Sequence, residues 1–235
     1  MNKLINRDRS IIPACDFDSI QKFEDILKET ADIPEVGAYK IGATLGLSHS
    51  LPSLAKIAHK YTNKPLIYDH QKAGTDIPDT GKSFMKMLKD AGIDSIIIFP
   101  LSGPATETAW IEASKESNLN LICGGHMTHK NFSVTEGGYI ADNAIEKMYL
   151  IAANLGIVDF VVPGNKPEVI LNIRKTLEAK NVTPVFYSPG FISQGGKISD
   201  AAIAAGSQWH AIVGRAIYES SDIKKDILSL ISQIK

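Results

Sequence analysis

The feature that most constrains this chain is a repeated alternation of short apolar segments with longer amphipathic ones. The short segments are rich in β-branched residues, as is typical of strands buried on both faces. The longer segments carry apolar residues at helical spacing. The predicted strands are residues 10–16, 36–41, 65–68, 95–99, 119–124, 159–162, 182–187 and 209–213. The first predicted helix begins at about residue 18. The next ones cover residues 48–61, 81–91, 106–117, 141–155 and 167–180, a short one passes through 202–205, and the last follows the final strand to about residue 234.

Eight strand-plus-helix units predict a (β/α)8 barrel, in which parallel strands close on themselves inside a ring of helices. A length of 235 residues suits one such barrel, and no linker divides the chain, so residues 1–235 are predicted to form a single domain. The competing fold is an open doubly wound sheet. That fold usually carries its glycine-rich loop after the first strand, whereas the glycines here follow the seventh.

Composition and charge exclude several classes of protein. The formal net charge of -1 argues against a nucleic-acid partner, which usually requires a basic surface. No apolar run approaches the length of a membrane span, and residues 1–9 lack the apolar core of a signal peptide, so a cytoplasmic protein is expected. Cys15 and Cys123 lie in strand-like segments and are predicted to be core residues rather than a disulfide.

Opposite charges gather directly after the third predicted strand, where Asp69, Lys72 and Asp76 fall within eight residues. Buried charges are costly unless they are paired, so a strand that ends in such a cluster indicates a functional site. Polar residues also end other predicted strands, and the carboxyl ends of barrel strands meet at one mouth. These residues are Asp16, Lys40, Asp69, Lys72 and Thr128.

A second signal indicates a phosphate site. A glycine-rich segment, residues 188–196, follows the seventh strand, and Val213-Gly214-Arg215 closes the eighth. Glycines let backbone N–H groups approach an anion, and an arginine can bind phosphate oxygens in a bidentate way. The loops after strands seven and eight are the usual phosphate site of barrels.

The histidines offer no metal site. His70, His126 and His129 are positioned in sequence to line the barrel mouth, but no pair has metal-ligand spacing with a carboxylate. The sequence therefore predicts no metal and, lacking any cofactor motif, no cofactor.

Several short motifs follow one another along nearly the whole chain, and their order makes them specific as a set. They are Ala14-Cys15-Asp16, Tyr39-Lys40-Ile41-Gly42, Asp76-Ile77-Pro78-Asp79-Thr80, Met127-Thr128-His129, Ser188-Pro189-Gly190 with Gln194-Gly195-Gly196, and Val213-Gly214-Arg215-Ala216-Ile217-Tyr218. In these motifs the chain resembles the orotidine 5'-phosphate decarboxylase family.

The resemblance implies roles for individual residues. The family's alternating Lys-Asp-Lys-Asp array would be Lys40, Asp69, Lys72 and Asp76. Asp76 and Thr80 would reach across a homodimer interface into the partner's site. The implied substrate-binding residues are Asp16 for the ribose, Thr128 for the base, Gln194, Gly214 and Arg215 for the phosphate, and also Ile77, Thr80, Pro189 and Gly195.

The central motif departs from the family pattern, Asp-x-Lys-x-x-Asp. This chain has one extra residue in each gap, between Asp69 and Lys72 and between Lys72 and Asp76. Because strand side chains alternate between faces, a bulge near His70-Gln71 is predicted to restore the facing of Lys72, with Gly74 absorbing the second insertion.

The expected activity is cofactor-independent decarboxylation of orotidine 5'-monophosphate to UMP, in de novo pyrimidine biosynthesis. Two alternatives stay open on the sequence. One is a metal-dependent sugar-phosphate decarboxylase or hexulose-phosphate synthase on the same barrel, and the other is a non-catalytic nucleotide-phosphate binder, which the two insertions suggest.

Overall fold

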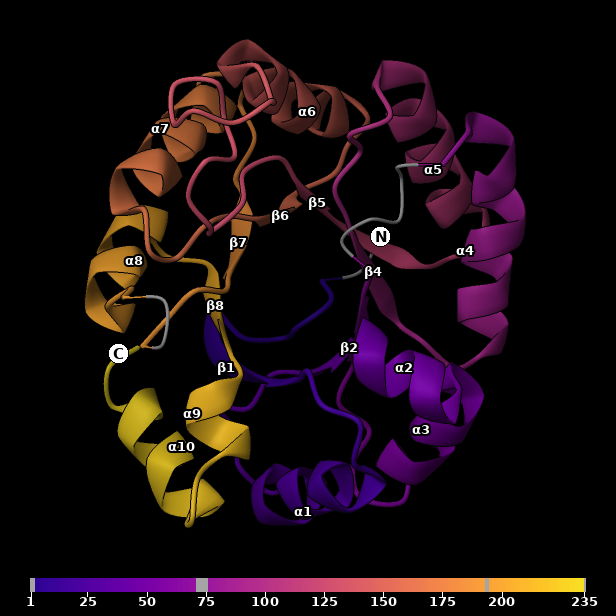
Figure 1. The fold of residues 1–235 in the computed structure, drawn as a ribbon, viewed down its shortest axis with the longest axis vertical. Helices are drawn as coiled ribbons and strands as arrows, with labels where there is room; N and C mark the ends of the chain where they lie inside the picture. The colour runs from indigo at the N-terminus through magenta and orange to yellow at the C-terminus, as the bar shows by residue number, and fades with distance from the viewer. Residues whose placement is uncertain (1–2, 71–75, 193–194, 235) are drawn as a thin grey trace.

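Eight parallel strands close into a barrel in the computed structural model, which describes residues 3–70, 76–192 and 195–234 (Figure 1). Each strand pairs with the next along the chain, and β1 closes the barrel against β8 from Arg9–Trp209 to Pro13–Val213. The (β/α)8 prediction is therefore confirmed. The strands are β1 (Arg9–Cys15), β2 (Tyr39–Gly42), β3 (Leu66–Asp69), β4 (Ser95–Ile98), β5 (Asn120–Gly124), β6 (Asp159–Val161), β7 (Val185–Ser188) and β8 (Trp209–Val213).

The helices form a ring outside the barrel (Figure 1). In α1, for example, Phe23, Ile26 and Leu27 face the strands at helical spacing, and the Ser19 side chain caps the first turn. The helices are α1 (Ile20–Thr30), α2 (Ala43–His49), α3 (Leu51–Ala58), the 3-10 turn η1 (Pro78–Thr80), α4 (Gly81–Asp90), α5 (Pro104–Glu116), α6 (Asp142–Asn154), α7 (Pro167–Glu178), α8 (Ile198–Ala205), α9 (Arg215–Tyr218) and α10 (Ile223–Ile231).

Three of the predicted helices are wrong in extent, and one of them is the short helix expected through 202–205, which begins at Ile198. The helix expected over 48–61 is two helices that begin at Ala43, and Ser50 separates them with a φ of 63°, a left-handed conformation that no helix accommodates. The terminal helix is likewise divided into α9 and α10. Strand β7 begins at Val185, later than predicted.

The core has two layers because strand side chains alternate between the barrel interior and the helices. Ile12, Ile67, Ile97 and Ile122 belong to the interior cluster, while the larger cluster fills the space between the strands and the helix ring. Leu4 and Ile5, which precede β1, are buried with the interior cluster and close the amino-terminal end of the barrel. The opposite end, where the strands finish, stays open for a site.

Both cysteines are buried and unpaired, as predicted for core residues. Cys123 lies beside Glu107 of α5, which is only 1% exposed, and its thiol donates to the Glu107 Oε1 atom at 3.8 Å. Burial raises the pKa of Glu107 to about 8. A carboxyl group that is neutral in the folded protein at pH 7 is therefore part of the outer core.

We expect Glu107→Gln to stabilise the protein at alkaline pH. The folded state keeps the Glu107 proton up to a pKa of about 8, whereas the unfolded chain releases it near the ordinary value of 4.5. The protonated Glu107 side chain therefore contributes its full share to the free energy of unfolding below pH 4.5, and this contribution is lost as the pH rises through 8. Glutamine cannot ionise, so the variant should exceed the wild type by roughly 4 kcal/mol in free energy of unfolding at pH 8 and nearly match it at pH 4.5.

Urea denaturation at both pH values measures this difference, and Glu112→Gln, on the exposed face of the same helix, is the matched control. Equal destabilisation of Glu107→Gln at both pH values would contradict the prediction.

Candidate active site

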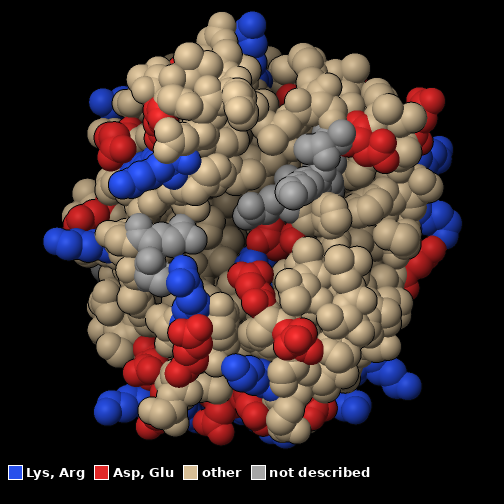
Figure 2. Space-filling model, viewed as in Figure 1, with Lys and Arg blue, Asp and Glu red and all other residues tan. Residues whose placement is uncertain are grey.

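A cavity of about 520 Å³ opens at the carboxyl ends of the strands. Figure 2 shows this face of the molecule hollowed near its centre, where acidic and basic side chains meet. Of the predicted site residues, seven line the cavity: Asp16, Lys40, Asp69, Thr128, Pro189, Gly214 and Arg215. They come from six different strand ends, so the closure of the barrel brings them together.

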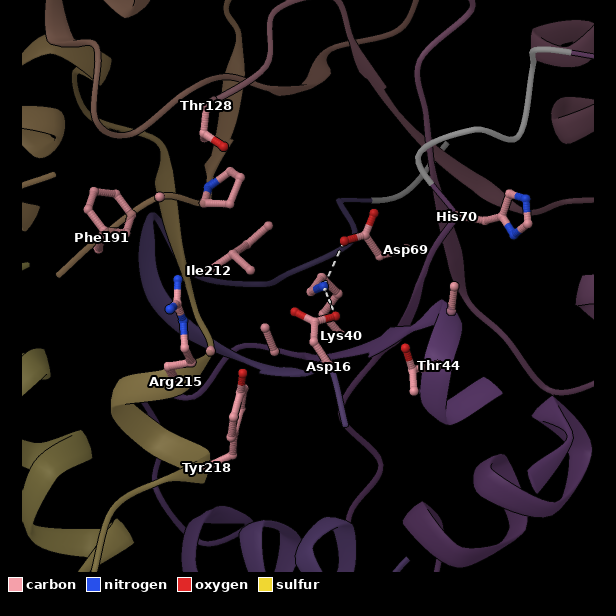
Figure 3. A pocket seen from close by; sticks show the side chains of 15 residues that line it. Asp16, Lys40, Thr44, Asp69, His70, Thr128, Phe191, Ile212, Arg215 and Tyr218 are labelled. Atoms are coloured by element: carbon pink, nitrogen blue, oxygen red, sulfur yellow. Dashed lines mark hydrogen bonds and ion pairs between the residues drawn. The ribbon is translucent and has the colours of Figure 1, made fainter. Parts of the chain in front are cut away.

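Lys40 is the centre of the charged part of this cavity. Its Nζ atom lies 2.7 Å from Asp16 Oδ1 and 2.7 Å from Asp69 Oδ2 (Figure 3). The Lys40 and Asp69 side chains are 5% and 8% exposed, whereas that of Asp16 is 48% exposed. Burial works to lower the pKa of Lys40, but the Asp69 and Asp16 carboxylates outweigh it and raise the pKa above its ordinary value. The amine is therefore a fixed positive charge.

Strand register explains why these three groups meet. Ala14 of β1 pairs with Lys40 of β2, and Gly42 of β2 pairs with Asp69 of β3. Asp16 and Asp69 therefore both lie two residues further toward the carboxyl end of the strands than Lys40, on either side of β2. Gly42 has no side chain between them, and a Cβ there would lie 2.1 Å from Asp16 Oδ1. The absence of that side chain leaves the space in which the long Lys40 side chain reaches both carboxylates.

The two carboxylate oxygens of Asp69 have different surroundings. Its Oδ2 atom is bound by Lys40, while Oδ1 is buried and has no hydrogen-bond partner within the part of the chain that the structure describes. An unpartnered buried carboxylate oxygen is unfavourable, and such groups concentrate at functional sites. Asp69 therefore has the character of a group held in place for a reaction.

The opposite side of the cavity is built by the last two strand ends. Arg215 and Tyr218 of α9 face the aspartates across the cavity, and Thr128 enters from the side of β5 (Figure 3). Pro189, Gly190 and Phe191 complete this side. Gly190 has a φ of 105°, a conformation that favours glycine, so the loop after β7 needs glycine there for its path.

Six predicted site residues do not line this cavity or cannot be placed. Asp76 and Ile77 are exposed and directly precede η1, and Thr80, the last residue of η1, is half-buried. The Asp76 carbonyl accepts from Thr106 Oγ1 at 2.9 Å. Gly195 also lies outside the lining. Lys72 and Gln194 fall outside the described residues, as does the bulge predicted near His70-Gln71.

Some residues that line the cavity were anticipated from the sequence and others were not. His70 lines the cavity, as its position allowed, while His126 and His129 do not. Thr44 and Ile212 were not singled out. Thr44 follows directly on β2 and Ile212 is an inward residue of β8, so strand-end position and strand alternation are the signals that could have found them. Tyr218 and Phe191 lie within segments that the sequence did mark.

The described residues contain neither a metal-ligand cluster nor a membrane span. Within ranges 3–70, 76–192 and 195–234, no three His, Cys, Asp or Glu side chains gather as metal ligands would. None of the helices there combines the length and apolar character needed to cross a bilayer.

Comparison with known proteins agrees with this geometry. Residues 9–229 match the model of the orotidine 5'-phosphate decarboxylase / HUMPS family. The chain is 32% identical over 213 residues to orotidine 5'-phosphate decarboxylase of Methanosarcina barkeri, covering 90% of each chain. It is 33% identical over 202 residues to the enzyme of Methanocaldococcus jannaschii, covering 85% of this chain and 88% of the relative.

A solved structure shares the fold over the same length. The Methanocaldococcus jannaschii orotidine 5'-monophosphate decarboxylase complexed with the inhibitor BMP superimposes with a TM-score of 0.84 and 26% sequence identity. The match covers 97% of this chain and 100% of that one. On this evidence from sequence and structure, the chain belongs to the orotidine 5'-phosphate decarboxylase / HUMPS family.

Proposed function

We propose that this protein is a carboxy-lyase that converts orotidine 5'-monophosphate to UMP and carbon dioxide without a cofactor, in de novo pyrimidine biosynthesis. The observation that carries the proposal is the Lys40 amine held between the Asp16 and Asp69 carboxylates in the cavity at the strand ends. The family match and the named relatives support the same reaction.

The substrate would span the cavity from its charged to its phosphate side. Gly214, Arg215 and Pro189 line one side of the cavity and are proposed to bind the 5'-phosphate. Gln194 and Gly195, which follow β7 in sequence, are proposed to bind it with them. Asp16, half-exposed beside Lys40, is proposed to hold the ribose. Thr128 is proposed to hold the base from the β5 side. This placement directs the carboxylate of the pyrimidine toward Asp69.

The proposed reaction has to stabilise a carbanion. Loss of the carboxylate leaves a carbanion at C6 whose lone pair lies in the ring plane, so the ring cannot delocalise it. Electrostatic stabilisation by preorganised charges is then the available means of lowering the barrier. Lys72 is proposed to lie beside C6, to stabilise the developing negative charge and to donate the proton. Lys40 would keep Asp69 in place.

Asp69 would act by repulsion in the ground state. Two like charges about 4 Å apart repel by about 4 kcal/mol at an effective dielectric constant near 20. The repulsion is relieved as carbon dioxide leaves, so it lowers the barrier rather than merely weakening binding. Asp69 is buried, and its Oδ1 atom has no hydrogen-bond partner among residues 3–70, 76–192 and 195–234, which supports this role.

The direct test is turnover of orotidine 5'-monophosphate by the purified protein, followed by the change in ultraviolet absorbance. A metal-dependent enzyme on the same barrel would lose activity in EDTA, and we expect no loss. A non-catalytic binder would bind UMP tightly without turning over substrate. Absence of turnover by the wild-type protein would refute the proposed function.

We also propose a cytoplasmic homodimer in which Asp76 and Thr80 complete the partner's site. Neither residue lines the cavity of its own chain, and both lie beside the exposed apolar side chain of Ile77, which is 59% exposed. Met87 of the neighbouring helix α4 is 53% exposed, which adds apolar surface for a second copy to cover. The two free, buried cysteines suit a reducing compartment.

Mixing two inactive variants tests whether Asp76 acts in the partner's site. We expect Lys72→Ala and Asp76→Asn homodimers each to be nearly inactive. A heterodimer would hold one site with both native residues, because each chain would supply the group that the other lacks. Subunit exchange of equal amounts should restore roughly one quarter of the wild-type activity, since half of the dimers are mixed and each has one complete site.

The control is the same exchange between Lys72→Ala and Asp69→Asn, whose residues belong to one chain's cavity and should give no recovery. Recovery that fails in the first mixture, with exchange verified by mass spectrometry, would place Asp76 in its own chain's site.

A further inference from the structure

The turn between β6 and α7, residues 162–166, contacts the loops on both sides of it. Toward the β7–α8 loop, the Gly164 N–H donates to the Pro189 carbonyl at 2.8 Å. A Cβ on Gly164 would lie 2.4 Å from the Phe191 ring. Pro189 and Phe191 line the cavity, so this side of the turn supports the predicted phosphate side of the site.

The next residue of the turn supports the loop that carries Thr128. The Asn165 side-chain Nδ2 atom donates to the Thr128 carbonyl at 2.9 Å. This bond fixes the backbone of the residue proposed to hold the base, although Asn165 itself does not line the cavity. Asn165 thus acts on the cavity through Thr128.

Lys166 fastens the same loop at a second point. Its Nζ atom forms an ion pair with Glu136 and lies 3.5 Å from the His129 carbonyl, to which it donates. Glu136 in turn accepts from the Phe132 N–H at 3.4 Å. The Lys166 and Glu136 side chains are only 13% and 30% exposed, so this pair is better shielded from solvent than an ordinary surface pair.

The loop needs such support because it has little regular structure of its own. Between β5 and α6, residues 125–141, the backbone pairing is an isolated bridge between Ser133 and Ile140. A long irregular loop loses conformational freedom when it must present one side chain to a ligand. Anchoring it before the ligand arrives removes that cost from binding.

We propose that Asn165 and Lys166 are positioning residues that hold the β5–α6 loop in place, so that Thr128 is presented to the pyrimidine base. This inference rests on the proposed function, because it takes the base of a nucleotide as the group that Thr128 contacts. The turn between β6 and α7 is then a specificity element for the base, although it touches no part of the substrate.

The test compares two ligands that differ in the base. Asn165→Asp keeps the size of the side chain but replaces the donor with an acceptor facing the Thr128 carbonyl. We expect it to weaken UMP binding by about tenfold in calorimetry, the effect of losing one partly buried hydrogen bond, while ribose 5-phosphate binding changes by less than about twofold. Equal weakening of both ligands, or of neither, would overturn the proposal.

Two further measurements separate positioning from general stability. If Asn165 acts through Thr128, the losses in UMP affinity from Asn165→Asp and Thr128→Ala should not add in the double variant. Lys166→Met should reproduce the selective loss for UMP. Lys224→Met, which removes the ion pair between Lys224 of α10 and Asp32, should not. Additive losses would overturn the role assigned to Asn165.

The proposed function and this inference fail in different ways. If the wild-type protein does not turn over orotidine 5'-monophosphate, the proposed function is refuted. If the wild type is active and the Asn165→Asp variant keeps its full kcat/KM and its full UMP affinity, only the positioning role is refuted.

Discussion

Replacing Lys72 by alanine is expected to lower kcat for orotidine 5'-monophosphate by at least about 10³-fold, because one substitution would remove both the proposed proton donor and the proposed positive charge beside C6. The expected change in UMP affinity is less than about tenfold, since the product carries no charge at C6 for the lysine to stabilise. A loss in kcat with little loss in binding identifies an interaction made in the transition state.

Single-turnover kinetics and UMP calorimetry measure the two quantities. The matched control is Lys86→Ala on α4, where Lys86 pairs with Asp90 on the surface, which should leave both unchanged. Full activity of Lys72→Ala would show that another group protonates C6. Because two residues are inserted around Lys72 relative to the family pattern, this variant also tests whether its side chain reaches the cavity.

Lys40→Met is the second substitution with a large expected effect, and it should reduce both activity and stability. Without the ammonium group, the buried Asp69 carboxylate loses the one counter-charge that the described part of the chain gives it and stays beside Asp16. Breaking a buried ion pair by removing one partner typically costs about 3–5 kcal/mol of stability. The loss of a preorganised charge should also lower kcat by about 10²–10³-fold.

The stability loss and the activity loss can be separated. In Lys40→Met/Asp69→Asn no unpaired buried charge remains, so the free energy of unfolding should recover while kcat stays low. Urea denaturation and turnover at pH 7 measure the two effects. If the urea midpoint of Lys40→Met equals that of the wild type, the Lys40–Asp69 pair does not stabilise the fold. The expected cost of leaving Asp69 without its partner would then be wrong.

The sequence predicted the order of strands and helices because each unit carries its own local pattern. β-branched runs and helical spacing are properties of a few consecutive residues, and they placed β4, β8 and α4 within a residue or so of their observed bounds. The helix expected over 48–61 differs from the structure because of a single backbone conformation. Ser50, with its φ of 63°, divides a segment whose apolar spacing alone predicts one helix.

The candidate site was predictable in part for the same reason. Polar residues at strand ends, such as Asp16, Lys40 and Asp69, stand out against apolar strands, and a barrel gathers strand ends at one mouth. Residues that act through a neighbour gave no such signal. Asn165 and Lys166 look like ordinary turn residues until the structure places them against Thr128 and Glu136, 37 and 30 residues away in sequence.

The sequence by itself determined the barrel, its eight units and the chemical types of the groups at its mouth, because alternation and strand ends are local properties. Only the tertiary structure decided that one lysine amine lies 2.7 Å from two carboxylates that come from strands on either side of it. That contact depends on the register of β1, β2 and β3 and on the missing side chain at Gly42, and register is set by packing between strands rather than within one.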